Sequence, residues 1–212
     1  MSEFCVEAVA GQKNVTIEIA NGDFEALRQD GYSLCLAKKA GSAENGYDVV
    51  WRADLDFFPL NTLSWIPQFE LFGTSSFVDG QRVEISTNIV EIGLGQTSTL
   101  GRNGILGPAT GGAPPSAMSM VNELGPIHPG LLQWFTWIDG DMQVQPIYAT
   151  PFVVESNEIV TFEPSDIVLV WFEQDIETSI IFTTPRANAV EIDLTYASSA
   201  TRLYSDGAWS TP

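Results

Sequence analysis

The sequence predicts an all-β protein, an antiparallel β-sandwich of jelly-roll or Greek-key type with about a dozen strands. Three observations support this fold class. Apolar and polar residues alternate with a period of two along most of the chain, as they do in half-buried strands. Turn signals rich in Gly, Asn and Asp separate these segments at short intervals. Helical character is confined to residues 23–29, which span barely two turns.

The first half of the chain begins with a clear alternating strand at 15–19 (VTIEI), which ends at the turn signal NGD. We expect 47–51 to pair with 32–36 across the Gly-containing turn at 41–46. Asp79-Gly80 predicts a hairpin turn. The full set of segments expected to be strands in this half is 15–19, 32–36, 47–51, 65–72, 83–85 and 89–94.

The second half continues in the same style. The run 167–172 (IVLVWF) is apolar on both faces, which predicts a strand at the centre of a sheet. Asp139-Gly140 predicts a hairpin between the first two strands of this half. The expected strands are 134–138, 143–147, 151–155, 159–162, 167–172, 179–182, 190–196 and a short edge at 202–204.

One long segment, 101–130, departs from the alternation. It holds seven of the 18 glycines and five of the 12 prolines, with only Arg102 and Glu123 charged. We interpret it as one long Gly/Pro-rich crossover loop of a single domain, 1–212. The alternative is two β subdomains, 1–100 and 131–212, joined by 101–130. A loop of this length in a compact domain often has a function.

The charge balance excludes some classes of partner. The net charge is −18, from 27 acidic and 9 basic residues. No basic stripe is present to neutralise phosphates, so we expect no nucleic-acid partner. Anionic membrane surfaces are disfavoured for the same reason. No apolar run reaches the roughly 18 residues of a membrane helix, so no membrane span is expected.

The N-terminal sequence and the cysteines predict a cytoplasmic protein. The first residues, MSEFC, have neither the basic start nor the apolar stretch of a secretory signal. Cys5 and Cys35 both lie in apolar segments, which favours two buried thiols in a reducing compartment. A disulfide between them is the open alternative.

Tryptophan supplies the candidate binding site. In an extended strand Trp134 and Trp137 fall on opposite faces, so one ring is exposed unless the strand is buried on both sides. Asp139 and Asp141 follow closely. An exposed aromatic ring that stacks on a sugar, with carboxylates that bind hydroxyls, is typical of carbohydrate sites. Burial of both rings in a two-sided core is the alternative.

His128 is the only histidine, and flanking prolines fix its direction. We include it among the candidate ligand-binding residues, although it equally fits a rigid turn. One imidazole excludes multi-histidine metal sites, and no phosphate-binding Gly motif is present, so we expect no metal and no cofactor. A hydrolase that uses His128 with carboxylates such as Glu173, Asp175 and Glu177 is an alternative.

The sequence thus predicts a non-enzymatic, lectin-like ligand-binding β-sandwich, with a small molecule or glycan as ligand. A self-assembling or partner-binding structural protein, such as a homo-oligomer, is the first alternative. A carboxylate-based enzyme that uses the 101–130 loop is the second.

Overall fold

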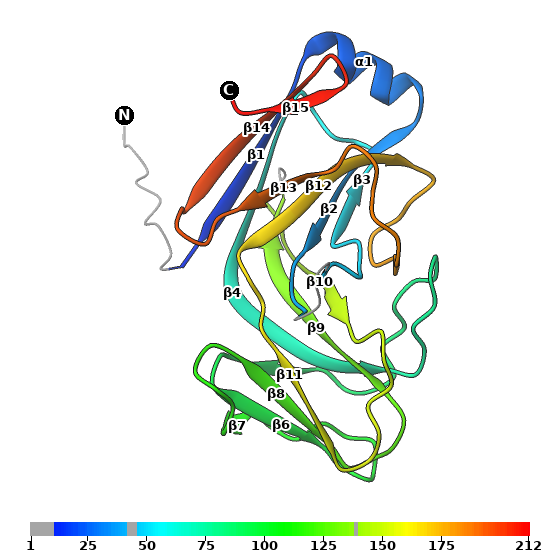
Figure 1. Ribbon diagram of the computed structural model, residues 1–212, viewed down its shortest axis with the longest axis vertical. Helices are drawn as coiled ribbons and strands as arrows, with labels where there is room; N and C mark the ends of the chain where they lie inside the picture. Colours follow the sequence, from blue (N-terminus) through cyan, green and yellow to red (C-terminus); the bar gives the residue numbers. More distant parts are fainter. Residues whose placement is uncertain (1–10, 42–45, 138–139) are drawn as a thin grey trace.

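The computed structural model describes residues 11–41, 46–137 and 140–212 (Figure 1). These residues form fifteen strands in three mostly antiparallel sheets, with one nine-residue helix. The all-β sandwich class is therefore confirmed. A jelly-roll is not confirmed, because the strands form three sheets with two parallel pairs, β1–β14 and β6–β8.

The largest sheet has seven strands. Its order is β10-β9-β4-β1-β14-β15, and β5 pairs with β4 beside this path. The fifteen-residue strand β4 extends along much of the molecule and links its two ends (Figure 1). The bounds are β1 Lys13–Ile19, β4 Leu60–Thr74, β5 Val90–Ile92, β9 His128–Thr136, β10 Met142–Ala149, β14 Ser199–Ser205 and β15 Ala208–Ser210.

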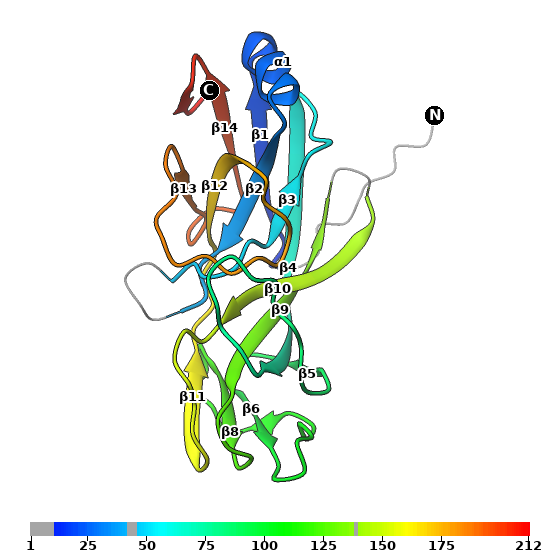
Figure 2. The same cartoon turned by 90° about the vertical axis from the view of Figure 1, so that its right-hand side faces the viewer.

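Two four-stranded sheets pack near opposite ends of β4. The sheet β13-β12-β2-β3 lies at the α1 end, and the sheet β11-β8-β6-β7 at the other (Figures 1 and 2). As its two-sided apolar run predicts, β12 is an inner strand, between β13 and β2. The bounds are β2 Tyr32–Lys38, β3 Arg52–Asp54, β6 Gln96–Leu100, β7 Thr110–Gly111, β8 Met118–Asn122, β11 Glu158–Phe162, β12 Ile167–Gln174 and β13 Val190–Asp193.

The main core contains side chains from all three sheets. Val15, Ile17 and Ile19 of β1 are buried on the face that their alternation predicts. They join a cluster that includes Leu36 of β2 and Met120 of β8. The large sheet thus buries apolar side chains against both smaller sheets, which is the packing of a sandwich.

The helix α1, Asn21–Gln29, follows β1 and lies beside the β14–β15 hairpin (Figure 2). Leu27 is its buried residue, and Phe24 packs edge-on against Phe57 with ring centroids 5.8 Å apart. The sequence predicted this helix within two residues of its start. Within the described ranges, no helix is both long and apolar enough to cross a membrane.

The 101–130 segment is not one long crossover loop, and that expectation is wrong. It contains β7, β8 and the first residues of β9. β8 pairs with β6 in parallel and with β11 in antiparallel orientation. Met118 and Met120 are buried and alternate as a strand requires. The neighbouring glycines and prolines masked this alternation.

Some expected strands are absent or differently paired. Residues 47–51 form no strand, and β2 pairs with β3 instead. Residues 47–51 make one isolated bridge, Val49 with Ile181, and the ladder with β2 begins only at Arg52, although Val49, Val50 and Trp51 are all fully buried. Residues 83–85 and 179–182 make only isolated bridges, and 151–155 contributes one as well.

The strand pairing argues against the two-subdomain alternative. Each sheet combines strands from before residue 101 with strands from after residue 130: β1 pairs with β14, β2 with β12, and β6 shares a sheet with β11. Residues 1–100 and 131–212 therefore do not form separate sheets. That the chain is one domain stays a prediction.

Candidate functional site

Trp137 is not an exposed platform, and the expectation that its ring stacks on a sugar is corrected here. Its side chain is 5% exposed. Its indole Nε1 donates a hydrogen bond to Asp54 Oδ2, and the Arg52 guanidinium lies 5.6 Å from its ring. Arg52 and Asp54 form an ion pair at 3.5 Å. Trp137 therefore lies in the main apolar core, with its indole N–H satisfied by Asp54.

Trp134 is half-buried and lines a different space. Its Nε1 donates to Glu70 Oε1 at 3.2 Å. Its ring borders a shallow cavity of about 120 Å³ together with Trp65, Phe135 and Met142. Pockets that hold small molecules usually measure roughly 300–1,000 Å³. This cavity is too small to enclose a sugar ring.

The remaining predicted site residues do not join the two tryptophans. His128 begins β9, roughly 20 Å along an extended strand from the nearer tryptophan. Its Nδ1 lies 2.8 Å from the carbonyl oxygen of Thr150, and its ring stacks on Phe77 at 6.0 Å. Asp141 is exposed next to β10. Asp139 lies outside the described residues.

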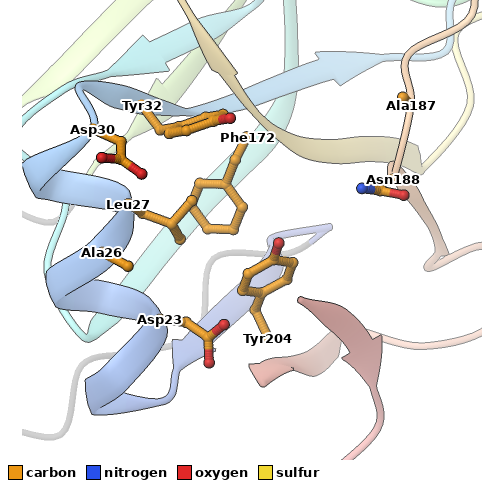
Figure 3. Close-up of a pocket in the computed structure, with 9 residues that line it drawn as sticks. All are labelled: Asp23, Ala26, Leu27, Asp30, Tyr32, Phe172, Ala187, Asn188 and Tyr204. Atoms are coloured by element: carbon orange, nitrogen blue, oxygen red, sulfur yellow. The ribbon is translucent and has the colours of Figure 1, made fainter. Parts of the chain in front are cut away.

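A larger pocket lies elsewhere, between α1 and the loop 183–189 (Figure 3). Its volume is about 330 Å³, within the range of small-molecule sites. We call it the α1 pocket. The side chains and backbone that line it come from α1, β2, β12, β14 and the loop: Asp23, Ala26, Leu27, Asp30, Tyr32, Phe172, Ala187, Asn188 and Tyr204.

Aromatic rings form the floor of the α1 pocket. Phe172 lies at its centre, with Tyr32 and Tyr204 on either side (Figure 3). The Phe172 and Tyr204 ring centroids are 4.8 Å apart. Trp209 supports this pair: it stacks parallel to Phe172 at 5.6 Å and meets Tyr204 at 4.9 Å. These contacts hold the floor in one arrangement.

Polar groups surround this floor. Both Asp23 carboxylate oxygens accept backbone N–H bonds, from Asp206 at 3.0 Å and Gly207 at 3.1 Å, so the orientation of the carboxylate is fixed. Asn188 has φ 52°, in the left-handed region that asparagine tolerates. Its carbonyl accepts the Trp209 indole N–H at 2.7 Å, which ties the loop to the floor.

The pocket lining carries negative charge only. Among the described residues, the charged side chains that line it are Asp23 and Asp30, and no Lys or Arg does. Burial, followed by the charge of Asp23, raises the pKa of Tyr204, so its hydroxyl stays protonated and can donate. The pocket therefore offers acceptors from carboxylates, donors and acceptors from phenols and an amide, and no group that would attract an anion.

Sequence reasoning missed the α1 pocket because its residues are 181 positions apart at the extremes, Asp23 and Tyr204. No local motif marks it. One signal was available: the C-terminal segment has two aromatics, Tyr204 and Trp209, around the turn Asp206-Gly207. A hairpin with aromatics on both strands and a nearby helix suggests an aromatic cluster at one end of the fold.

In the described part of the chain, no three His, Cys, Asp or Glu side chains are arranged to hold a metal ion. Comparison with known proteins gives no relative to reason from: no family model, no curated protein and no solved structure matches this chain.

Proposed function

We propose that this protein is a non-enzymatic ligand-binding β-sandwich and that the α1 pocket binds a carbohydrate residue. The observation that carries the proposal is the combination of an aromatic floor with a mixed polar rim. Phe172 and Tyr204 offer apolar ring faces to the C–H groups of a sugar. Asp23, Asp30 and Asn188 surround them with groups that bind hydroxyls.

A neutral polyol suits the rim better than a bare cation or an anion. Each sugar hydroxyl both donates and accepts, and the rim supplies both functions: carboxylates accept, while phenols and the Asn188 amide also donate. A cation would use only the acceptors. An anion would meet Asp23 and Asp30 without any base in the lining.

Binding assays with a panel of neutral mono- and disaccharides test the proposal. We expect at least one sugar to bind saturably in calorimetry. Asp30→Ala removes an exposed carboxylate from the rim without touching the core, so it should weaken binding about ten-fold or more, as loss of a hydrogen bond to a charged group does. Tyr32→Phe, which removes one hydroxyl, should have a smaller effect.

Glu25→Gln is the matched control for Asp30→Ala. Glu25 is an exposed acid on the same helix and does not line the pocket. It should leave affinity unchanged. The proposal is wrong if no neutral sugar binds the wild type, or if Glu25→Gln and Asp30→Ala have equal effects.

Self-assembly is a second candidate, favoured by an exposed apolar ridge. Leu55, Phe58 and Leu60 each expose more than half of their side chains within six residues. Exposed apolar patches often mark interfaces, and we propose a second copy of this chain as the occupant. Light scattering should show a fixed oligomer that Phe58→Ser dissociates. A monomeric wild type would contradict it.

We also propose a cytoplasmic location. The support is the free, buried thiol of Cys35, which suits a reducing compartment. Cys5, the other thiol that the sequence predicts to be free, lies outside the described residues. Fractionation of cells that express the chain tests this location.

A further inference from the structure

A second cavity lies on the outer face of the sheet β13-β12-β2-β3. Two residues of β12 show which face this is. Leu169 lines the cavity, whereas Phe172, which lines the α1 pocket, packs against the main core on the other face of the strand. The cavity measures about 500 Å³. Its apolar lining comes from Pro151, Leu169, Phe182, Pro185 and Ala189. We call it the Asp48 cavity.

Glu191, on one side of the Asp48 cavity, has its charge satisfied within the protein. Its Oε2 accepts the Tyr47 hydroxyl at 2.9 Å and lies 3.8 Å from Lys39 Nζ. Burial and this carboxylate raise the pKa of Tyr47 far above its usual range, so the phenol remains a donor to Glu191. Lys39 also lies 5.7 Å from the Tyr47 ring.

Arg186, on another side of the cavity, also has its charge paired within the protein, although its Nε is buried and has no hydrogen-bond partner among the described residues. Its guanidinium pairs with Glu173 Oε1 at 3.2 Å and lies 4.8 Å from the Phe182 ring. The other oxygen of Glu173 accepts the Trp171 indole N–H at 2.7 Å. Both cations of this region are thus paired with carboxylates of the protein, and the unpartnered Nε of Arg186 is buried away from solvent, which disfavours an anionic ligand.

Asp48 differs from Glu191 and Arg186 because its charge has no such partner among the described residues. Its side chain is half-buried in the cavity lining, and among the described residues it has no hydrogen bond or ion pair from its carboxylate. Burial raises the pKa of Asp48 to about 6, and the charge of Asp48 contributes to the raised pKa of Tyr148 nearby. A half-buried carboxylate without a partner is unfavourable, and a cation or a donor would relieve that cost.

We propose that the Asp48 cavity binds a small organic ammonium ion, with the ammonium group on the Asp48 carboxylate and its apolar body against Leu169, Pro151 and Pro185. An ammonium supplies both the positive charge and the N–H donors that Asp48 lacks. Because Glu191 and Arg186 already have partners of opposite charge in the protein, Asp48 is the charged group of the lining that a ligand can pair with. The net charge of −18 also draws cations toward the protein. This proposal does not rest on the α1 pocket.

Titration with benzylamine, followed by backbone amide chemical shifts, tests it. We expect saturable shifts at residues that line the cavity, such as Leu169 and Phe182, and a much weaker response to benzyl alcohol, the neutral analogue. Asp48→Asn should reduce benzylamine affinity about ten- to a hundred-fold, the loss expected for one charge-assisted hydrogen bond. It should leave the response to benzyl alcohol unchanged.

Two further variants keep the test decisive. Glu84→Gln removes an exposed acid outside the cavity and serves as the charge control, with affinity expected to be unchanged. Thr184→Phe places bulk in the cavity from an exposed position and should block benzylamine in a folded protein. The proposal is overturned if the wild type gives no saturable shifts, if shifts fall elsewhere, or if Asp48→Asn binds benzylamine as well as Glu84→Gln does.

Discussion

Lys38 lies inside the sandwich with 1% of its side chain exposed. Its Nζ is 4.6 Å from the Trp65 ring and 5.7 Å from that of Trp51, and it pairs with Asp166 Oδ1 at 3.5 Å. Asp166 also pairs with Lys13, at 3.3 Å. Burial lowers the pKa of Lys38 to about 7, and Asp166 only partly opposes this shift. The interior of this protein thus holds Lys38 with a pKa close to neutral pH.

This residue predicts a pH dependence of stability. Between pH 7 and 10.5 the unfolded chain binds more protons at Lys38 than the folded protein, so the Lys38 contribution to the free energy of unfolding rises with pH. Below pH 7 the full cost of burying the charge is present. Lys38→Met leaves Asp166 paired with Lys13, so it should be more stable than wild type at pH 6, by about 1–4 kcal/mol, and the gap should narrow at pH 9. Urea unfolding at the two pH values measures it.

Asp166→Asn is the companion variant, because it removes the partner instead of the buried charge. It should destabilise the protein at pH 6 by about 3–5 kcal/mol, since Lys38 is then buried and unpaired. A Lys38→Met variant less stable than wild type at pH 6, or a gap that widens at pH 9, would refute this account.

Trp137 and Trp134 should respond very differently to replacement by alanine. Trp137→Ala should lower the free energy of unfolding by about 3–5 kcal/mol, because it opens a cavity and removes the donor to Asp54. Trp134→Ala should cost clearly less, because its ring is half-buried at a shallow cavity. Thermal and urea melts of the two variants check this, and equal losses would disagree with the structure.

At the level of elements, Asn122 fixes the chain that follows β8 in the Gly/Pro-rich 101–130 segment. It ends β8 and is fully buried. Its Nδ2 donates to the carbonyl oxygens of Gly125, Val154 and Glu155, at 2.6, 2.9 and 3.1 Å. Its Oδ1 accepts the backbone N–H of Leu124 at 3.0 Å. Where β8 ends, the amide side chain of Asn122 thus provides the backbone groups nearby with hydrogen bonds that a neighbouring strand would otherwise supply.

Asn122→Leu should therefore destabilise the protein by about 3 kcal/mol or more, because several buried backbone groups lose their partner at once. Hydrogen exchange should show faster exchange at Leu124 and Gly125. Asn157→Gly is a suitable comparison, since Asn157 has φ 70°, which glycine adopts readily. A stability loss no larger for Asn122→Leu than for Asn157→Gly would contradict this role.

The elements that sequence reasoning found and those it missed differ in the range of their contacts. Strands such as β1 and β12 carry their burial pattern in their own residues, so alternation or a continuous apolar run was enough. β8 pairs with two strands that are distant in sequence, β6 and β11. The residues next to β8 in the sequence are rich in Gly and Pro, which are typical of turns. The 47–51 segment has the composition of a strand but makes only one isolated bridge, and periodicity does not show whether a segment finds a partner strand.

The candidate site shows the same limit more strongly. Trp134 and Trp137 are only three residues apart in sequence, yet one is half-buried and the other is in the core. The α1 pocket gathers its residues from five separated segments, and only the three-dimensional packing of α1 on the C-terminal hairpin brings Asp23 near Tyr204. Composition predicted aromatic and acidic binding groups, but not where they meet.

At the scale of the whole molecule, the shared core predicts a single cooperative unfolding transition. The main apolar cluster includes side chains from all three sheets, and β4 extends between both ends. Calorimetry should give one peak with equal calorimetric and van't Hoff enthalpies. Two resolved transitions would show that the two ends of the molecule unfold as separate units.

If the α1 pocket binds a carbohydrate, chemical-shift mapping with the neutral sugar that binds best should locate the contact there. We expect saturable shifts concentrated at Tyr32, Asn188 and Tyr204, which lie together around the floor of the pocket (Figure 3). Shifts centred on Trp134, or none with any neutral sugar, would contradict this proposal.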